Sequence, residues 1–356
     1  MGPAGVASDM IDRLLLILPY DVAPTGLIEM LQSRFNRLLE IAPDGSVNWE
    51  KPRTSRVRSD DPDVNIRFAA KGVHLWGSPA MVMGTNNVFG SSDIRECATS
   101  MLLHASRALE CMLPSIEVWQ LGGLDITHNY MLEDVRDVKS ALSFYGRISN
   151  GKLKTTRYPE SVYFGMGSRL RTGKIYAKGY QLEKLGKKHD LGLSNWQKAI
   201  CYNFLRFELC LKSYWFARYL KTHPGWEWLD MTEDDLESIY GEFWADIVGP
   251  GGEVELPATD LDMEGRILDA AASLCLSVGL GTAAFKTWCC IQSVGCDNTR
   301  YMTSPATWYR HLNILKHAGL TTADFQEGEV LPVRINTIRL GEPVNSWDDV
   351  RRRLVA

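Results

Sequence analysis

The feature that most constrains the fold of this chain is a change of hydrophobic periodicity along its length. Up to about residue 220, short apolar segments of strand length alternate with segments of helical spacing, and polar turns separate them. The first such segment runs from Ile11 to Leu18 and ends before Pro19. Beyond residue 264 the spacing is mainly helical. The pattern predicts an α+β protein, with a sheet and packed helices in its N-terminal part and a mainly helical C-terminal part.

The individual elements follow from the same periodicity. Strands are predicted at residues 11–18, 47–49, 64–68, 72–76, 117–127, 161–165 and 174–180, with short ones at 330–340. Helices are predicted at residues 94–112, 131–145, 195–220, 264–278, 281–294 and 304–318.

Charge is distributed unevenly along the chain. The formal net charge is −4, yet residues 147–188 hold eleven Lys or Arg and two acids, a local charge of +9. Residues 222–265 hold thirteen acids and no Lys or Arg. A polyanion such as DNA is attracted to the first segment and repelled by the second.

These shifts of composition predict four parts. Residues 1–9 form a leader of small residues, with Met10 as the natural start, and residues 10–221 form the N-terminal domain. Residues 222–265 are predicted to be an acidic linker, and residues 266–356 a helical C-terminal domain.

Several classes of protein are disfavoured. The eight cysteines include no C-x-x-C pair and no matched histidine spacing, so a zinc site is not expected. Asp9 and Asp12 interrupt any secretory h-region, which favours a cytoplasmic protein. Residues 267–285 are nearly apolar over nineteen positions, but their polar and glycine content favours a buried helical hairpin over a membrane span.

The basic segment contains two tyrosines four residues apart, Tyr176 and Tyr180. A phenol held among cations that bind phosphate can attack a phosphodiester, and the phosphotyrosine bond stores the energy for rejoining the strand. Lys178 lies two residues after Tyr176, on the same side of a predicted strand, where it would stabilise the phenolate or the leaving oxygen. The alternative is a solvated basic face with two exposed tyrosines.

Further cations surround the glycine-rich turn that precedes the tyrosines. Backbone amides and guanidinium groups in such a turn approach a phosphate closely. The candidate DNA-binding residues here are Ser168, Arg169, Arg171 and Lys174, and Arg206, outside the turn, is a further candidate.

Three polar residues on apolar segments are candidate metal ligands. Asp125 and His74 lie in predicted strands, and Glu208 lies in the predicted helix 195–220, two residues after Arg206. A divalent ion that polarises the scissile phosphate would need such ligands near the tyrosines. For each residue taken alone a structural hydrogen bond or ion pair is the favoured explanation, and the metal site is favoured only if the three side chains converge.

A second DNA-binding signal lies in the C-terminal part. Ser304 and Pro305 open an amphipathic segment that stops at Gly319, which is typical of a capped helix. With the preceding helix it resembles a helix-turn-helix unit in which Arg310, Asn313 and Lys316 face a DNA groove. An ordinary helical hairpin explains the same pattern.

In the residues described above, the chain resembles the filamentous-phage gene II replication proteins, the initiators of phage rolling-circle replication. The resemblance covers roughly residues 10–350, and no single motif decides it. Its specific matches are Met10-Ile-Asp-Arg-Leu-Leu, Ser78-Pro79-Ala80, Asn87-Val88-Phe89-Gly90, Asp125, Ser149-Asn150-Gly151, Ser168-Arg169-x-Arg171-Thr172, Tyr176-x-Lys178 and Arg206-Phe207-Glu208-x-x-x-Lys212.

The resemblance implies a nicking-closing enzyme. Members cut the plus strand at the phage origin, stay on the 5′ phosphate through a tyrosine that matches Tyr176, and later join the displaced strand into a circle. It also implies dependence on Mg²⁺ (or Mn²⁺), work with a host helicase and polymerase on double- and single-stranded origin DNA, and a homo-oligomer on DNA in the cytoplasm of the bacterial host. The expected fold is like the degenerate rolling-circle endonucleases, an antiparallel sheet with helices on one side.

The chain also departs from this family. It has Thr85-Asn86-Asn87 where relatives carry Gly-His-Asn, and His74-Leu75-Trp76 supplies only the first half of the His-hydrophobic-His metal motif of other rolling-circle nucleases. Tyr180 is an additional residue that would allow two tyrosines to alternate. A non-catalytic DNA-binding regulator that uses residues 304–318 is the main alternative, and a metal-independent tyrosine recombinase is a third.

Overall fold

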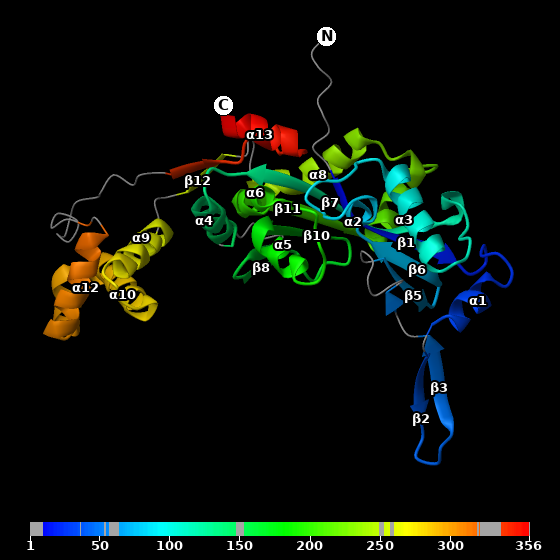
Figure 1. Cartoon of the computed structure of the whole chain (residues 1–356), viewed down its shortest axis with the longest axis horizontal. Helices are drawn as coiled ribbons and strands as arrows, with labels where there is room; N and C mark the ends of the chain where they lie inside the picture. The colour runs from blue at the N-terminus through cyan, green and yellow to red at the C-terminus, as the bar shows by residue number, and fades with distance from the viewer. Residues whose placement is uncertain are drawn as a thin grey trace, which may run out of the picture. The chain divides into compact units, whose positions relative to one another are not determined.

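A computed structural model of the chain describes residues 10–35, 37–52, 55–56, 64–146, 153–248, 253–256, 260–318, 320 and 336–355. The chain divides into two compact units, Met1–Glu253 together with Leu340–Ala356, and Val254–Arg339 (Figure 1). The second unit is therefore inserted in the sequence of the first, and the last helix returns to the first unit.

The first unit is built on a nine-stranded sheet in the order β4-β5-β6-β1-β7-β11-β10-β9-β8. Every neighbouring pair in it is antiparallel. The strands are β1 (Met10–Pro19), β4 (Ser55–Arg56), β5 (Asn65–Ala69), β6 (Gly72–Gly77), β7 (Gln120–Met131), β8 (Thr155–Tyr158), β9 (Ser161–Phe164), β10 (Arg171–Ala177) and β11 (Phe204–Lys212). A separate hairpin joins β2 (Arg37–Ile41) and β3 (Val47–Pro52).

The α-helices of this unit are α1 (Leu27–Ser33), α2 (Pro79–Met83), α3 (Ile94–Ala108), α4 (Val135–Tyr145), α5 (Lys178–Gly186), α6 (Asn195–Ile200), α7 (Ser213–Thr222), α8 (Glu233–Val248) and α13 (Trp347–Val355). Short 3-10 helices occupy Ile116–Val118 (η1), Cys201–Asn203 (η2) and Trp228–Asp230 (η3). The α+β class predicted from the sequence is confirmed.

One face of the sheet is apolar and is covered by helices. At β10, Gly173 permits close approach of α8, because a Cβ atom there would lie 2.4 Å from the Phe243 ring. On β11 the ring of Phe207 packs against Trp244 at 4.9 Å, and on β7 His128 stacks on Tyr240 at 3.8 Å. This core fixes the position of β10 and β11, whose other side chains form the opposite face.

The prediction of one helix over residues 195–220 was wrong. The structure has α6, η2, β11 and α7 there. The alternation was present in the sequence, because Leu205, Phe207, Leu209 and Leu211 are apolar and fully buried while the residues between them are mostly polar. As a result Arg206 and Glu208 lie on a central strand rather than on a helix.

The predicted strand 174–180 ends early. β10 stops at Ala177, and α5 begins at Lys178. Gly179 packs closely on η2: a Cβ atom there would lie 2.7 Å from the Tyr202 backbone, so a residue with a side chain would not fit at this position. Tyr176 is therefore on a strand, whereas Lys178 and Tyr180 are in the first turn of a helix.

The acidic segment predicted as a linker contains secondary structure. Helix α8 lies within it, and Leu236, Tyr240, Phe243 and Trp244 are buried at helical spacing. Its acids lie between these apolar positions, so the composition reflects an amphipathic helix. The division between the two units falls after Glu253 instead.

The second unit is a helical bundle of α9 (Asp260–Ser273), α10 (Val278–Val294), α11 (Cys296–Met302) and α12 (Pro305–His317). β12 (Glu253–Leu256) and β13 (Asn336–Arg339) form a two-stranded sheet. Ile267, Ala284, Trp288, Trp308 and Ile314 are among the buried residues of its core. Among the described residues no helix combines the length and hydropathy of a membrane span.

The C-terminal segment packs on the first unit. The backbone amide of Val344 donates to the carbonyl of Asn129 at 2.7 Å, and Trp347 contacts the rings of Phe89 and Phe204. This segment thereby holds the loop around Phe89, which crosses one end of the face opposite α8.

Candidate functional site

The face of the sheet opposite α8 carries a row of polar side chains across its central strands. Residues directly opposite each other in an antiparallel pair point to the same face. Two rows follow from the observed register, Tyr176–Arg206–Asn129 and Lys174–Glu208–Thr127, each running from β10 through β11 to β7. Asp125 lies on the same face of β7, opposite Cys210. The structure thus brings the predicted tyrosine and both predicted carboxylates to one surface.

A β-bulge in β1 adds two charged residues to this surface. Ile11 pairs with Ile126 and Arg13 with Asp125, so Asp12 is an extra residue between two paired positions. Bulges reorient side chains in this way, often beside functional sites. Successive side chains of a regular strand point to opposite faces. The bulge explains how the neighbours Asp12 and Arg13 can both contact the polar face.

Asp125 and Arg13 form an ion pair at the more open part of this face. The Arg13 Nε donates to Asp125 Oδ2 at 3.0 Å, and the Asp125 side chain is only 10% exposed. Burial raises the pKa of Asp125, and Arg13 opposes that rise. Oδ1 of Asp125 is buried and accepts no hydrogen bond from a nitrogen or oxygen of the described residues. A cation could therefore still be bound there.

Glu208 lies diagonally across from Asp125 on the next strand. Its Oε1 is 3.7 Å from Lys174 Nζ. Burial raises the pKa of Glu208, Lys174 lowers it, and the negative charge of Asp125 raises it again. Two buried carboxylates on neighbouring strands, one of which raises the pKa of the other, form a site that an added cation would stabilise.

Tyr176 is buried, with 4% of its surface exposed. Lys174 Nζ lies 4.0 Å from the centre of its ring. Burial raises the pKa of Tyr176 well above its ordinary value, and Glu208 raises it further, whereas the charge and hydrogen bond of Arg206 lower it. Arg206 and Lys174 are therefore the cations placed to stabilise a Tyr176 phenolate.

Lys178 is completely buried, and its ammonium points into a polar network. Its Nζ donates to Asn87 Oδ1 at 2.8 Å and to Gln181 Oε1 at 2.9 Å. Asn87 Nδ2 in turn donates to Asp12 Oδ1 at 2.9 Å. Burial and the charge of Arg206 lower the pKa of Lys178 well below its ordinary value. The network connects Lys178 to the loop that follows α2.

Arg206 is also fully buried and lies beside Tyr176, directly opposite it on β11. Its Nε donates to Asn129 Oδ1 at 2.8 Å, and its Nη2 donates to the carbonyl of Val88 at 2.6 Å. Its Nη1 is 3.6 Å from Asp12 Oδ2. Protein groups thus surround the guanidinium that was predicted to contact DNA.

Tyr180 and His74 lie apart from these groups. The Tyr180 ring packs edge-on against Tyr202 at 5.2 Å on α5 and η2. His74 pairs with Ile17 on β1, four residues, or about 13 Å of extended strand, from the position of Arg13. Its Nδ1 lies 3.2 Å from Arg67 Nη2, and burial and the charge of Arg67 lower its pKa. Among the described residues no cluster of three or more potential ligands is assembled.

The glycine-rich turn lies at the other end of β10. Ser168 Oγ accepts from the backbone amides of Leu170 and Arg171, so it stabilises the turn. Arg169 is exposed near the Tyr214 ring, at 6.0 Å. Arg171 pairs with Glu242 of α8 at 3.2 Å, on the helix-covered side. These residues do not meet Tyr176, which is five or more residues further along the chain.

Arg310 and Lys316 lie in the second unit. Both are exposed on α12, together with Tyr309, Asn313 and His317, while Trp308, His311, Ile314 and Leu315 are buried. Ser304 caps this helix by accepting from the Thr307 amide at 3.3 Å. The predicted outward face of this helix is therefore present, and it carries no acid.

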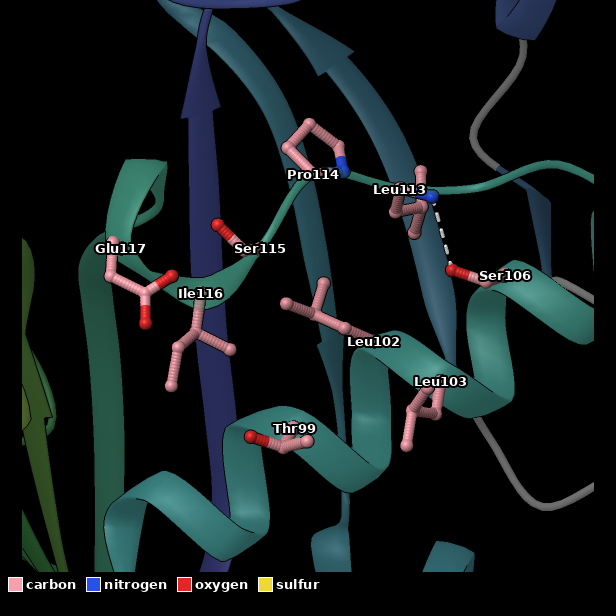
Figure 2. A pocket seen from close by; sticks show the side chains of 9 residues that line it. All are labelled: Thr99, Leu102, Leu103, Ser106, Leu113, Pro114, Ser115, Ile116 and Glu117. Carbon is pink, nitrogen blue, oxygen red and sulfur yellow. Dashed lines mark hydrogen bonds between the residues drawn. The ribbon is translucent and has the colours of Figure 1, made fainter.

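A pocket of about 300 Å³ lies elsewhere in the first unit, between the end of α3 and residues 113–117 (Figure 2). It is lined mainly by apolar side chains such as Leu102, Leu113 and Ile116, and Ser106 Oγ accepts from the Leu113 amide at 3.1 Å at its edge. It contains none of the predicted site residues and no cation or tyrosine.

The prediction from sequence missed four polar residues of this site, Asp12, Arg13, Asn87 and Asn129. Two of them were visible as signals: Asp12 interrupts an apolar strand, and Asn87 belongs to the Asn87-Val88-Phe89-Gly90 segment. Nothing in the sequence indicated that a bulge would turn Asp12 toward Arg206. Asn129 follows an apolar run and carried no such signal.

Comparison with known proteins identifies a phage replication protein. Residues 10–229 match the family described as the N-terminal part of the replication-associated protein G2P. The chain belongs to this family of filamentous-phage proteins.

Individual relatives agree with this assignment. The chain is 26% identical over 341 residues to the replication-associated protein G2P of Enterobacteria phage I2-2, covering 88% of each chain. It is 26% identical over 171 residues to the protein of the same name from Enterobacteria phage M13, covering 42% of this chain and 41% of the relative. A solved rolling-circle replication initiator from Geobacillus stearothermophilus aligns over 68% of this chain and 86% of its own, at 12% identity and a TM-score of 0.31, which is too low to support an argument.

Asp12 should be essential for the stability of the first unit. Removing one partner of a buried ion pair leaves an uncompensated charge, so Asp12→Ala should lower the free energy of unfolding by about 3 kcal/mol. Asp348→Ala is the control, because the Asp348 side chain is 83% exposed in its pair with Arg351 and should change stability by less than about 0.5 kcal/mol. Urea unfolding followed by circular dichroism measures both. A loss no larger than the control's would mean that Arg206 does not depend on Asp12.

Proposed function

We propose that this chain initiates rolling-circle replication by nicking the plus strand at a phage origin through a covalent 5′-phosphotyrosine on Tyr176, and that it later rejoins the displaced strand. The observation that carries the proposal is the position of Tyr176, opposite Arg206 and under Lys174 on the polar face that also holds Asp125 and Glu208. The family assignment to replication-associated proteins supports the same activity.

The proposed chemistry is a transesterification. The Tyr176 oxygen forms a bond to phosphorus while the bond from phosphorus to the 3′ oxygen breaks, and the phenolic proton ends on the released 3′ hydroxyl. The reverse reaction, with a free 3′ hydroxyl as nucleophile, rejoins the strand and regenerates Tyr176. Because burial keeps the Tyr176 phenol protonated, nearby cations must stabilise the phenolate as the proton leaves.

The cations divide into two roles. Lys174 is partly exposed, contacts the Tyr176 ring and can reach a phosphate. Arg206 is buried opposite Tyr176 and stabilises the phenolate by its charge. Lys178 was predicted to stabilise the phenolate or the leaving oxygen directly. In this proposal its role is indirect, because its ammonium group donates to Asn87 and Gln181 and holds the loop after α2. Arg169 lies far along the sheet and is proposed to contact a distant part of the DNA.

Asp125 and Glu208 are suited to hold a magnesium or manganese ion. Mg²⁺ commonly binds to one or two carboxylates and completes its shell with water and substrate phosphate. The buried Oδ1 of Asp125, which accepts no hydrogen bond from a nitrogen or oxygen of the described residues, fits such an ion, as do the pKa values of the two carboxylates, which burial raises. When bound, it would polarise the scissile phosphate. The distance of His74 from this pair argues against including it among the ligands.

The α12 face is proposed to bind the double-stranded origin. It presents Arg310, Lys316 and His317 without any acid, so its charge is complementary to the negative charge of DNA. Recognition of duplex DNA would thus fall to the second unit and cleavage to the first. The proposal extends to a host helicase and polymerase as partners in the bacterial cytoplasm, and to a homo-oligomer on DNA.

Tyr176→Phe should abolish the covalent adduct while leaving DNA binding intact, because only the attacking oxygen is removed. The measurement incubates purified protein and Mg²⁺ with a labelled single strand or supercoiled plasmid carrying the cognate origin, followed by denaturing gels and peptide mass spectrometry. Tyr180→Phe and Tyr202→Phe are matched controls that should keep the adduct. An adduct that persists in Tyr176→Phe would place the nucleophile on another tyrosine, and binding without any cleavage by the natural protein would favour the regulator.

Asp125→Asn and Glu208→Gln should each lower Mg²⁺-dependent cleavage by on the order of a hundredfold, since an ion contributes several kcal/mol to stabilising the transition state. The same variants should lose the rise in melting temperature that Mn²⁺ causes by binding the folded protein. His74→Ala is the control and should retain both properties. Cleavage that is insensitive to EDTA would contradict the metal proposal and favour a tyrosine recombinase.

A double Arg310→Ala, Lys316→Ala variant should bind duplex origin DNA at least tenfold more weakly and show a shallower dependence on salt, because two phosphate or base contacts are lost. Its cleavage of a single-stranded origin oligonucleotide should be unchanged. Arg351→Ala, Arg352→Ala on exposed α13 is the matched control. Undiminished duplex binding in the α12 variant would assign origin recognition to another surface.

A further inference from the structure

Two tyrosines outside the proposed chemistry lie on the same face of the sheet as Tyr176. Tyr163 on β9 is directly opposite Lys174. Tyr158 on the edge strand β8 is opposite Ser161, which is itself opposite Tyr176. Opposed residues share a face, so both rings project from the surface that carries Tyr176.

The two rings form a compact pair next to a cation. Their centres are 5.5 Å apart and their planes are inclined at 79°. Lys174 Nζ lies 5.8 Å from the centre of the Tyr163 ring and 4.0 Å from that of Tyr176. A single ammonium group therefore connects the aromatic pair to the proposed nucleophile.

The pair is accessible, unlike the aromatic residues on the other face. Tyr158 is 46% exposed and Tyr163 is half-buried, whereas Phe164 and Phe207, which point to the helix-covered side, are almost fully buried. The core does not need these two rings, so their contribution to stability is small compared with that of Phe164 or Phe207. Accessible rings beside the partly exposed Lys174 are suited to contact a base and its backbone phosphate together.

The distance from these rings to Tyr176 suits a neighbouring nucleotide. Tyr163 and Tyr176 are diagonal neighbours on adjacent strands, for which the separation is about 7–8 Å. A phosphate at Tyr176 would therefore place an adjoining base over β9 and β8. Bases are available for stacking only in an unpaired strand, because in a duplex their faces cover one another.

We propose that Tyr163 and Tyr158 form a stacking site for unpaired bases of the DNA strand that flanks the cleaved phosphodiester, with Lys174 bound to the backbone phosphate between them and Tyr176. The assignment of the cleaved phosphodiester to Tyr176 rests on the proposed function, whereas binding of a single strand does not. The site would make the first unit a reader of melted DNA, independent of base sequence, since every base has a stackable face.

The test measures binding of oligothymidylate that carries one 2-aminopurine, in EDTA so that no cleavage occurs. Tyr163→Ala and Tyr158→Ala should each weaken binding on the order of tenfold and reduce the fluorescence change caused by stacking. Tyr163→Phe should retain both, because the ring remains. Tyr20→Ala is the matched control, a tyrosine of the same unit that is 39% exposed and follows β1. Duplex DNA of equal length should bind all variants with unchanged affinity.

Unchanged single-strand affinity in both alanine variants would overturn the stacking site. An equal loss for single strands and duplex would also overturn it, because a general electrostatic or folding defect affects both. If Tyr163→Ala fails to fold by circular dichroism, the more exposed Tyr158→Ala and the Tyr163→Phe variant decide the question. Failure of the proposed function would be distinguishable from failure of the stacking site. If the proposed function is wrong, the natural protein forms no adduct on Tyr176. Loss of single-strand binding in the alanine variants would still support the stacking site.

Discussion

The pairing of β10 with β11 is the constraint on which the rest of the site depends. It places Tyr176 opposite Arg206 and Lys174 opposite Glu208, and continues on β7 to Asn129. A register shift of one residue would move all of these side chains to the helix-covered face. The packing of α8 on Gly173 and Phe207 prevents such a shift, so the apolar side of the sheet determines the geometry of the polar side.

Burying two cations behind a tyrosine has a cost that the fold must offset. Lys178 and Arg206 are fully buried, and the groups that compensate their charges are Asp12, Asn87, Asn129, Gln181 and a backbone carbonyl. Gln181 lies on the same helix as Lys178, whereas the other groups come from three distant parts of the chain: the bulge in β1, the loop after α2 and strand β7. Such a network stabilises the fold only when complete, because each unpaired buried charge is costly.

The two units carry different kinds of surface. The first unit offers a sheet face with a tyrosine, cations, carboxylates and exposed rings, while the second offers a helix with a basic outer face. In the proposed function, duplex recognition and single-strand chemistry are therefore carried by separate structures. The return of the chain through Val344 and Trp347 to the loop at Phe89 also makes the last helix part of the first unit.

The sequence by itself determined the α+β class, the basic segment with Tyr176, and Asp125 and Glu208 as acids on apolar elements, because periodicity, charge and isolated polar residues are local properties. It predicted a catalytic role for Lys178, DNA contact for Arg206 and a metal site for His74 without indicating what these side chains contact. It also assigned β11 to a helix, although the alternation of Leu205, Phe207, Leu209 and Leu211 was visible. Only the tertiary structure decided which polar residues meet. Strand order, the register of β10 on β11 and the bulge at Asp12 depend on contacts between residues that are far apart in the sequence, from 77 positions for Arg206 and Asn129 to 118 for Val88 and Arg206, and no local pattern encodes such contacts.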